Sequence, residues 1–115
     1  MVIEASESYP SLNYALITSE PVYADNHWHL AVGVINHAEQ KTYIYVDGMK
    51  KAASSTANMG SPDAAGIPFQ IGRRGTRTNE FFDGAIDEVM VWNRPLSRTE
   101  IELLYHSQKE GRNSR

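Results

Sequence analysis

Three carboxylates interrupt an otherwise apolar stretch near the end of the sequence, and they are the first candidates for chemistry. Asp83, Asp87 and Glu88 all lie within residues 81–92. Carboxylate oxygens are the ligands that Ca²⁺ prefers, so the three predict a calcium site that loop carbonyls would complete. One segment supplies few of the roughly six to eight oxygens that Ca²⁺ takes. In the alternative, Asp83 shapes a turn with Gly84, and Asp87 or Glu88 hydrogen-bonds the backbone at a β-bulge.

Aromatic and basic side chains offer a second kind of chemistry, which is the recognition of sugars. Alternation along a strand places Tyr43 and Tyr45 on one face, where flat aromatic rings can stack on sugar rings. A basic loop that could bind sulfated or acidic glycans through paired hydrogen bonds contains Arg73, Arg74, Arg77 and Asn79. The alternatives are a core or a dimer seam for the tyrosines and a solvated loop for the arginines.

Two histidines flank a tryptophan at the start of an apolar run. His27 and His29 share one face at strand spacing, and they could bind zinc or a sugar hydroxyl. No third ligand is in obvious register, although His37 and His106 stay candidates. In the alternative, Trp28 lies in the core and both histidines lie on the outer face.

Composition narrows the class of protein. The 115 residues suit one compact domain, and a hydrophobic fraction of 41% is ordinary for a globular protein. The net charge of −3 offers no electrostatic footprint for nucleic acid or for an anionic membrane. The sequence has no cysteine, which excludes disulfides, thiolate metal sites and cysteine nucleophiles.

The sequence carries no recognisable targeting segment. Its first residues lack the basic start and apolar run of a signal peptide, and no run of about 18 apolar residues occurs, so no membrane insertion is expected. The compartment therefore stays open. An extracellular location is expected if the sequence is a piece of an exported parent.

Short apolar runs between turn signals predict a mostly β protein. The expected strands are residues 14–18, 28–35, 42–46, 49–53, 67–72 and 81–92. Asp47 and Gly48 form the strongest hairpin signal, because a two-residue primed turn needs positive φ at both positions. Residues 54–66 are expected to form a long loop, and the alternation within the last strand breaks at 87–88.

A single helix is expected after the last strand. Ser97 and Glu100 form a capping box, and an apolar stripe at helical spacing follows until Gly111. The members of this stripe are Ile101, Leu104 and Tyr105. The predicted organisation is a loose arm over 1–12, a β-sandwich with a C-terminal helix over 13–110, and a frayed tail over 111–115.

Three blocks of the sequence resemble laminin-G-like domains of the concanavalin A-like lectin/glucanase type. Residues 28–32 resemble a W-H-x-A-V block, residues 43–48 an L-Y-V-D-G hairpin, and residues 82–97 the closing strand and helix start. The resemblance covers roughly 14–107. It implies an all-β fold, an antiparallel jelly-roll β-sandwich of about six strands with a short C-terminal helix.

The resemblance covers only about half of such a domain, because several strands are expected on the N-terminal side. A sandwich without them would expose strand edges and an apolar face. The sequence is then a fragment of a longer protein, one half of a homodimer that completes both sandwiches, or a minimal monomer with repacked strands. Symmetric self-pairing is the expectation, because it is a common remedy for a complementary exposed surface.

The resemblance also bears on catalysis. Retaining glycosidases of related folds use two carboxylates in a pattern that resembles Glu-x-Asp-x-x-Glu, and this sequence has Ala85 and Met90 at the two glutamate positions. No G-x-S-x-G nucleophile motif occurs either. We therefore expect a non-catalytic module that recognises carbohydrate, or a protein surface, through loops at the end of the sandwich. The alternatives are a structural or assembly module and, third, a glycoside hydrolase.

Overall fold

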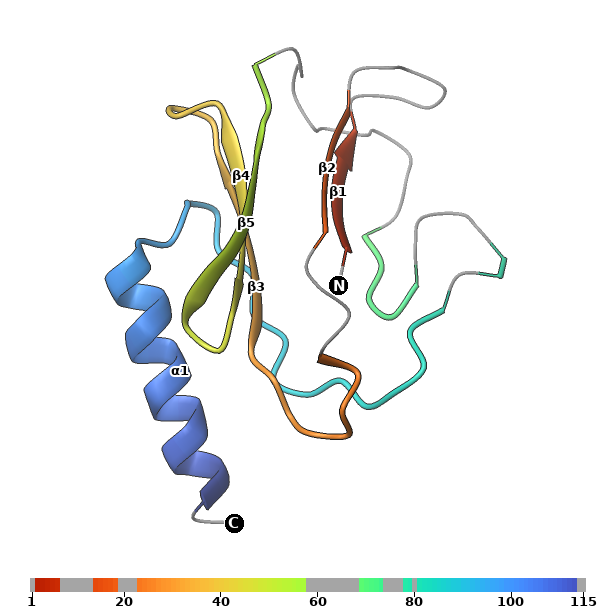
Figure 1. Cartoon of the computed structure of the whole chain (residues 1–115), viewed down its shortest axis with the longest axis vertical. Helices are drawn as coiled ribbons and strands as arrows, with labels where there is room; N and C mark the ends of the chain where they lie inside the picture. The colour runs from red at the N-terminus through yellow and green to blue at the C-terminus, as the bar shows by residue number, and fades with distance from the viewer. Residues whose placement is uncertain are drawn as a thin grey trace.

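A three-stranded antiparallel sheet forms the centre of the molecule (Figure 1). The computed structural model describes residues 2–6, 14–18, 23–57, 69–73, 78–79 and 81–113. The central sheet has the order β3 (Ala31–Asn36), β4 (Lys41–Val46) and β5 (Met49–Ser55). Asp47 and Gly48 join β4 to β5 with φ angles of 52° and 80°, as a primed turn requires. The predicted hairpin is confirmed.

A second, two-stranded sheet lies beside the central one. It pairs β1 (Val2–Ser6) with β2 (Tyr14–Thr18), and β2 lies close to β4 and β5 (Figure 1). The strand predicted at 14–18 is confirmed. The expectation of a loose arm over 1–12 is wrong for the residues of β1. Their sequence shows no clear alternation, but pairing with β2 satisfies their backbone hydrogen-bonding groups.

The C-terminal helix α1 (Arg98–Asn113) begins at the predicted capping box. The Glu100 amide donates to Ser97 Oγ at 3.2 Å, and the Ser97 amide donates to Glu100 Oε2 at 2.8 Å. The Arg94 guanidinium donates to both oxygens of Glu100, at 2.8 and 2.9 Å, and with the Ser97 amide it lowers the pKa of Glu100 to about 2. The helix ends two residues past the predicted end at Gly111, which is within the usual uncertainty of a helix boundary.

Helix α1 covers one face of the central sheet. The side chain of Ile101 is fully buried and packs in one cluster with Val32, Val34 and Tyr45. Leu30, Tyr43 and Leu96 are partly buried around this cluster. Of the predicted apolar stripe, Ile101 builds this core, whereas Leu104 and Tyr105 are only partly buried.

The opposite face of the sheet carries a smaller cluster. Ile44 and Val46 alternate with Tyr45 along β4, so they point away from α1, and they pack with Tyr23 and Ala52. In Figure 1 the two-stranded sheet lies on this side. The sheet is thus covered on both faces, with the helix on one side only.

Residues 81–92, which we call the closing segment, differ from the prediction. They were expected to form the longest strand, yet the structure assigns no strand there, only an isolated bridge between Phe81 and Arg73. A strand needs a neighbour that pairs with its amides and carbonyls, and no described strand pairs with this segment in either sheet. Its exposed large apolar side chains are Phe81, Phe82, Ile86, Val89, Met90, Val91 and Trp92.

The strand expected at 67–72 is also absent from the described residues of that range. Residues 67–68 lie outside the described residues, and residues 69–72 contain no strand. What the structure supports is a mostly β fold with a three-stranded antiparallel sheet and a C-terminal helix. Within the described part of the chain, no helix has the length and apolar character to cross a membrane.

Truncating the buried residue of α1 tests this core. We expect Ile101→Ala to lower the free energy of unfolding by about 2 to 5 kcal/mol, because it leaves a cavity under the helix. The control is Leu103→Ala on the same helix, where the side chain is 64% exposed and the expected loss is within about 0.5 kcal/mol. Urea denaturation measures both. Equal losses for the two variants would contradict the packing of α1.

Candidate functional site

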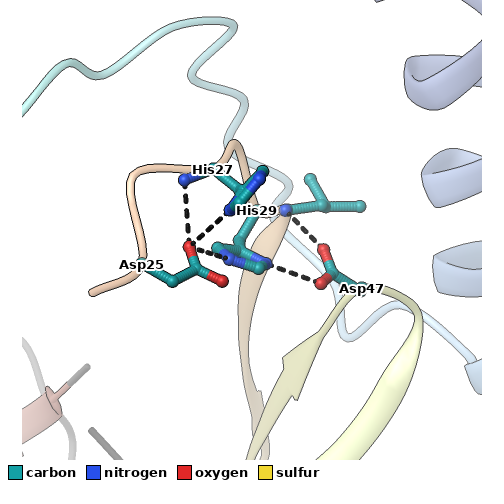
Figure 2. Close-up of polar contacts among 5 residues, drawn as sticks. Asp25, His27, His29 and Asp47 are labelled. Carbon is teal, nitrogen blue, oxygen red and sulfur yellow. Dashed lines mark hydrogen bonds and ion pairs between the residues drawn. The ribbon is translucent and has the colours of Figure 1, made fainter. Parts of the chain in front are cut away.

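A histidine held between two carboxylates marks the end of the central sheet (Figure 2). His29 Nε2 lies 3.0 Å from Asp25 Oδ1, and His29 Nδ1 lies 2.7 Å from Asp47 Oδ2. Asp25 belongs to residues 23–30, which we call the Trp28 loop, and Asp47 belongs to the β4–β5 turn. The imidazole therefore joins the loop that enters β3 to the turn of the neighbouring hairpin.

Backbone hydrogen bonds fix the two elements on which the cluster is built. The Asp47 amide donates to the Leu30 carbonyl, and the Leu30 amide donates to Asp47 Oδ1, both at 3.0 Å. Within the loop, Asp25 Oδ1 accepts from the His27 amide at 2.9 Å, while Asn26 takes a positive φ of 63°. This Asx-type turn folds the loop back, so that Asp25 faces the imidazole four residues further on.

The charges of the cluster stabilise one another. The hydrogen bond to Asp47, followed by that to Asp25, raises the pKa of His29 above its ordinary value of 6.5 against the opposing effect of burial. The hydrogen bond from His29, followed by that from the His27 amide, lowers the pKa of Asp25 below its ordinary value of 3.8. The Tyr23 ring packs edge-on against the imidazole, with ring centroids 5.2 Å apart.

Trp28 lies on the outside of this cluster. Its side chain is 53% exposed, and its neighbour His27 is exposed as well. The alternative placed Trp28 in the core and both histidines on the outer face. It is wrong for Trp28, which is exposed, and for His29, whose side chain is only 20% exposed. The strand begins only at Ala31, so alternation does not extend back to the tryptophan. An exposed indole next to imidazole and carboxylate groups can stack on a flat apolar surface while its neighbours bind hydroxyl groups.

The two tyrosines predicted to bind sugars lie on the helix side of the sheet. Tyr45 is 8% exposed and belongs to the core cluster with Ile101. Tyr43 is partly buried; its hydroxyl donates to Glu39, which raises the pKa of the phenol, and Lys50 Nζ lies 5.4 Å from its ring centre. Their place favours the core alternative, and a role in ligand binding stays a prediction.

The predicted basic loop is described only in part. Arg73 is exposed, and its guanidinium carbon lies 5.8 Å from the centre of the Phe81 ring. Asn79 is exposed, whereas Arg74 and Arg77 lie outside the described residues. Glycan binding by this loop stays a prediction.

The three carboxylates predicted to bind calcium are exposed. Asp87 Oδ1 accepts from the Glu88 amide at 2.8 Å, and Glu88 has a positive φ of 51°. Asp87 therefore hydrogen-bonds the backbone, as the alternative to a calcium site predicts. It does so without a β-bulge, because residues 81–92 form no strand. Across the described ranges no group of three or more His, Asp and Glu side chains has an arrangement that could hold a metal ion. Calcium binding by Asp83, Asp87 and Glu88 stays a prediction.

The sequence pointed to the histidines but not to their carboxylate partners. Asp47 was predicted only as a turn residue, and no role was predicted for Asp25. A signal for Asp25 was present, because Asp25 and Asn26 are both of residue types that favour turns, and Asp25 precedes His29 by four residues. The contact with Asp47 spans 18 positions and depends on the pairing of β3 with β4.

Comparison with known proteins identifies the family. A sequence model described as the Concanavalin A-like lectin/glucanases superfamily matches residues 3–102, and the chain belongs to this superfamily. The resemblance to laminin-G-like domains is thereby confirmed.

One solved structure supports the same fold. It is an S-layer domain-containing protein from Clostridium thermocellum ATCC 27405, with a TM-score of 0.61 and 19% sequence identity. The match covers 80% of this chain and 45% of that one, so the chain spans less than half the length of that structure. The search of curated proteins found no match.

Proposed function

We propose that this domain is a non-catalytic binding module that recognises carbohydrate through the Trp28 loop. The observation that carries the proposal is the exposed indole of Trp28 on a loop that His29 ties to the β4–β5 turn. A flat apolar ring on a fixed loop loses little conformational freedom when it stacks on a sugar ring. The loop lies at the end of the sheet, where modules built on β-sheets commonly bind.

Polar groups beside the indole suit a ligand rich in hydroxyls. His27 is exposed and offers a ring nitrogen, and the Asp25 carboxylate is partly exposed next to it. Ionised carboxylates accept hydrogen bonds from hydroxyl groups, and an imidazole can donate or accept them. A purely apolar partner would leave these groups without compensation, so carbohydrate is favoured over an apolar protein surface.

The absence of a catalytic pair supports a binding role. Ala85 and Met90 occupy the positions where related glycosidases carry glutamates, so the chemistry of a nucleophile and an acid is missing at this place. The superfamily name covers both lectins and glucanases, and membership alone does not choose between them. The side chains of this chain favour the lectin class.

A glycan array with fluorescently labelled protein tests the proposal. We expect binding to a set of glycans, at least a tenfold loss with Trp28→Ala, equivalent to about 1.4 kcal/mol, and no loss with the control Trp92→Ala. Trp92 is also exposed but lies in the closing segment. We expect a calcium chelator to leave binding unchanged. An array silent with and without calcium, or equal losses for both tryptophans, would contradict the proposal.

A second candidate function, self-assembly, is favoured by the closing segment. Seven large apolar side chains are exposed there, an arrangement that isolated soluble domains rarely keep. The segment also carries Asp83, Asp87 and Glu88, whereas the edge strand β5 carries exposed Lys50 and Lys51. Opposite charges on the two surfaces suit pairing between copies of the chain. In this candidate a second copy covers the closing segment, and each copy completes the jelly-roll sandwich of the other.

Size-exclusion chromatography with light scattering tests self-assembly. We expect a dimer at micromolar concentration and a shift to monomer with Val91→Asp, because a charge in an apolar seam is costly to bury. His106→Asp adds the same charge on an exposed position of α1 and should leave the dimer intact. A wild-type protein that is monomeric throughout would exclude this candidate.

A further inference from the structure

The cluster of Asp25, His29 and Asp47 requires a particular protonation state. An ionised carboxylate only accepts hydrogen bonds, and both ring nitrogens of His29 face carboxylate oxygens, at 2.7 and 3.0 Å. A neutral imidazole has a single N–H, so it can donate to one of these oxygens but not to both. Both contacts therefore need the doubly protonated imidazolium.

The two carboxylates differ in how the rest of the structure anchors them. Asp47 is anchored apart from the imidazole, because its amide and Oδ1 both bond Leu30. Asp25 belongs to the exposed loop, and its contacts beyond the imidazole are to His27, at 2.9 Å from the amide and 3.5 Å from Nδ1. When His29 loses one proton, the remaining proton stays on Nδ1, which makes the shorter contact to Asp47. The lone pair of Nε2 then faces Asp25 Oδ1.

We propose that Asp25, His29 and Asp47 form a proton-operated clamp, which holds the Trp28 loop on the β4–β5 turn when His29 is charged and releases the Asp25 end when it is neutral. The effect of the clamp on glycan affinity rests on the proposed function, whereas the clamp itself does not. Because Trp28 lies between Asp25 and His29 in the sequence, release frees the indole. Glycan affinity therefore falls as the pH rises.

Among the described residues, few other charges lie near His29. The Tyr23 ring lies edge-on to the imidazole, and Lys51 Nζ lies 6.0 Å from the centre of the tyrosine ring. Helix α1 brings Tyr105 against the turn, where a Cβ on Gly48 would lie 3.4 Å from the tyrosine. Two carboxylates thus face the imidazole directly, and Lys51 and His27 lie further out.

The pH window follows from the shifted groups. The pKa of His29 is raised in the folded protein, so its stabilising effect is complete below the ordinary value of 6.5 and is lost as the pH rises through the raised pKa. The pKa of Asp25 is lowered, so its effect is present above 3.8 and is lost as the pH falls through the lowered pKa. The clamp is therefore closed in mildly acidic solution, and it opens on the alkaline side.

A titration of the ¹⁵N-labelled full chain, followed by NMR, tests the clamp. We expect His29 to titrate above 6.5, to keep the proton on Nδ1 in its neutral form, and to shift the Trp28 indole signal with the same midpoint. Asp47→Asn should lower the pKa of His29 more than Asp25→Asn does, and the control His106→Gln should leave it unchanged. A His29 that titrates at or below 6.5, or a Trp28 signal that does not follow it, would overturn the clamp.

The glycan array separates the clamp from the proposed function. Binding measured at about pH 5.5 and about pH 8.5, which lie on either side of an ordinary histidine pKa, should be stronger at the lower pH by about fivefold or more. His29→Gln should remove this difference. An array that is silent while His29 titrates as expected would exclude glycan binding and leave the clamp standing. Glycan binding with equal affinity at both pH values would overturn the regulation.

Discussion

The two-residue turn between β4 and β5 is the constraint on which the rest of the structure depends. Its positive φ angles set the register of the hairpin, and its Asp47 bonds Leu30 through both amide and carboxylate. The same carboxylate accepts from His29, and Gly48 leaves room for Tyr105 of α1. Hairpin, Trp28 loop and helix therefore meet at one turn, and a side chain at position 48 would strain the backbone, because φ there is 80°.

The two sides of the molecule differ in how completely they are covered. Under α1 the apolar side chains of β3 and β4 are buried around Ile101, as in an ordinary core. The closing segment exposes large apolar side chains, and no described strand pairs with it in either sheet. Local packing thus stabilises the sheet and the helix, while the closing segment contributes little to the core. This contrast separates the part of the domain for which we propose binding through a fixed loop from the part for which we propose assembly.

Features set by local chemistry could be predicted from the sequence. The primed turn at Asp47, the capping box of Ser97 and Glu100, and the packing of Ile101 each follow from a few neighbouring residues, and each is confirmed. The closing segment was predicted wrongly, since an apolar alternating run becomes a strand only when another strand pairs with it. The clamp was missed because the approach of His29 to Asp47 depends on the register of β3 and β4.

A double-mutant cycle on His29 and Asp47 tests whether the turn holds the Trp28 loop through the charged imidazole. The cycle compares His29→Gln, Asp47→Asn and the double variant by urea denaturation in mildly acidic solution. We expect a coupling free energy of about 1 to 3 kcal/mol, typical of a charge-assisted hydrogen bond between partly buried groups. Additive losses within about 0.5 kcal/mol would contradict it, because independent residues do not hold a loop to a turn.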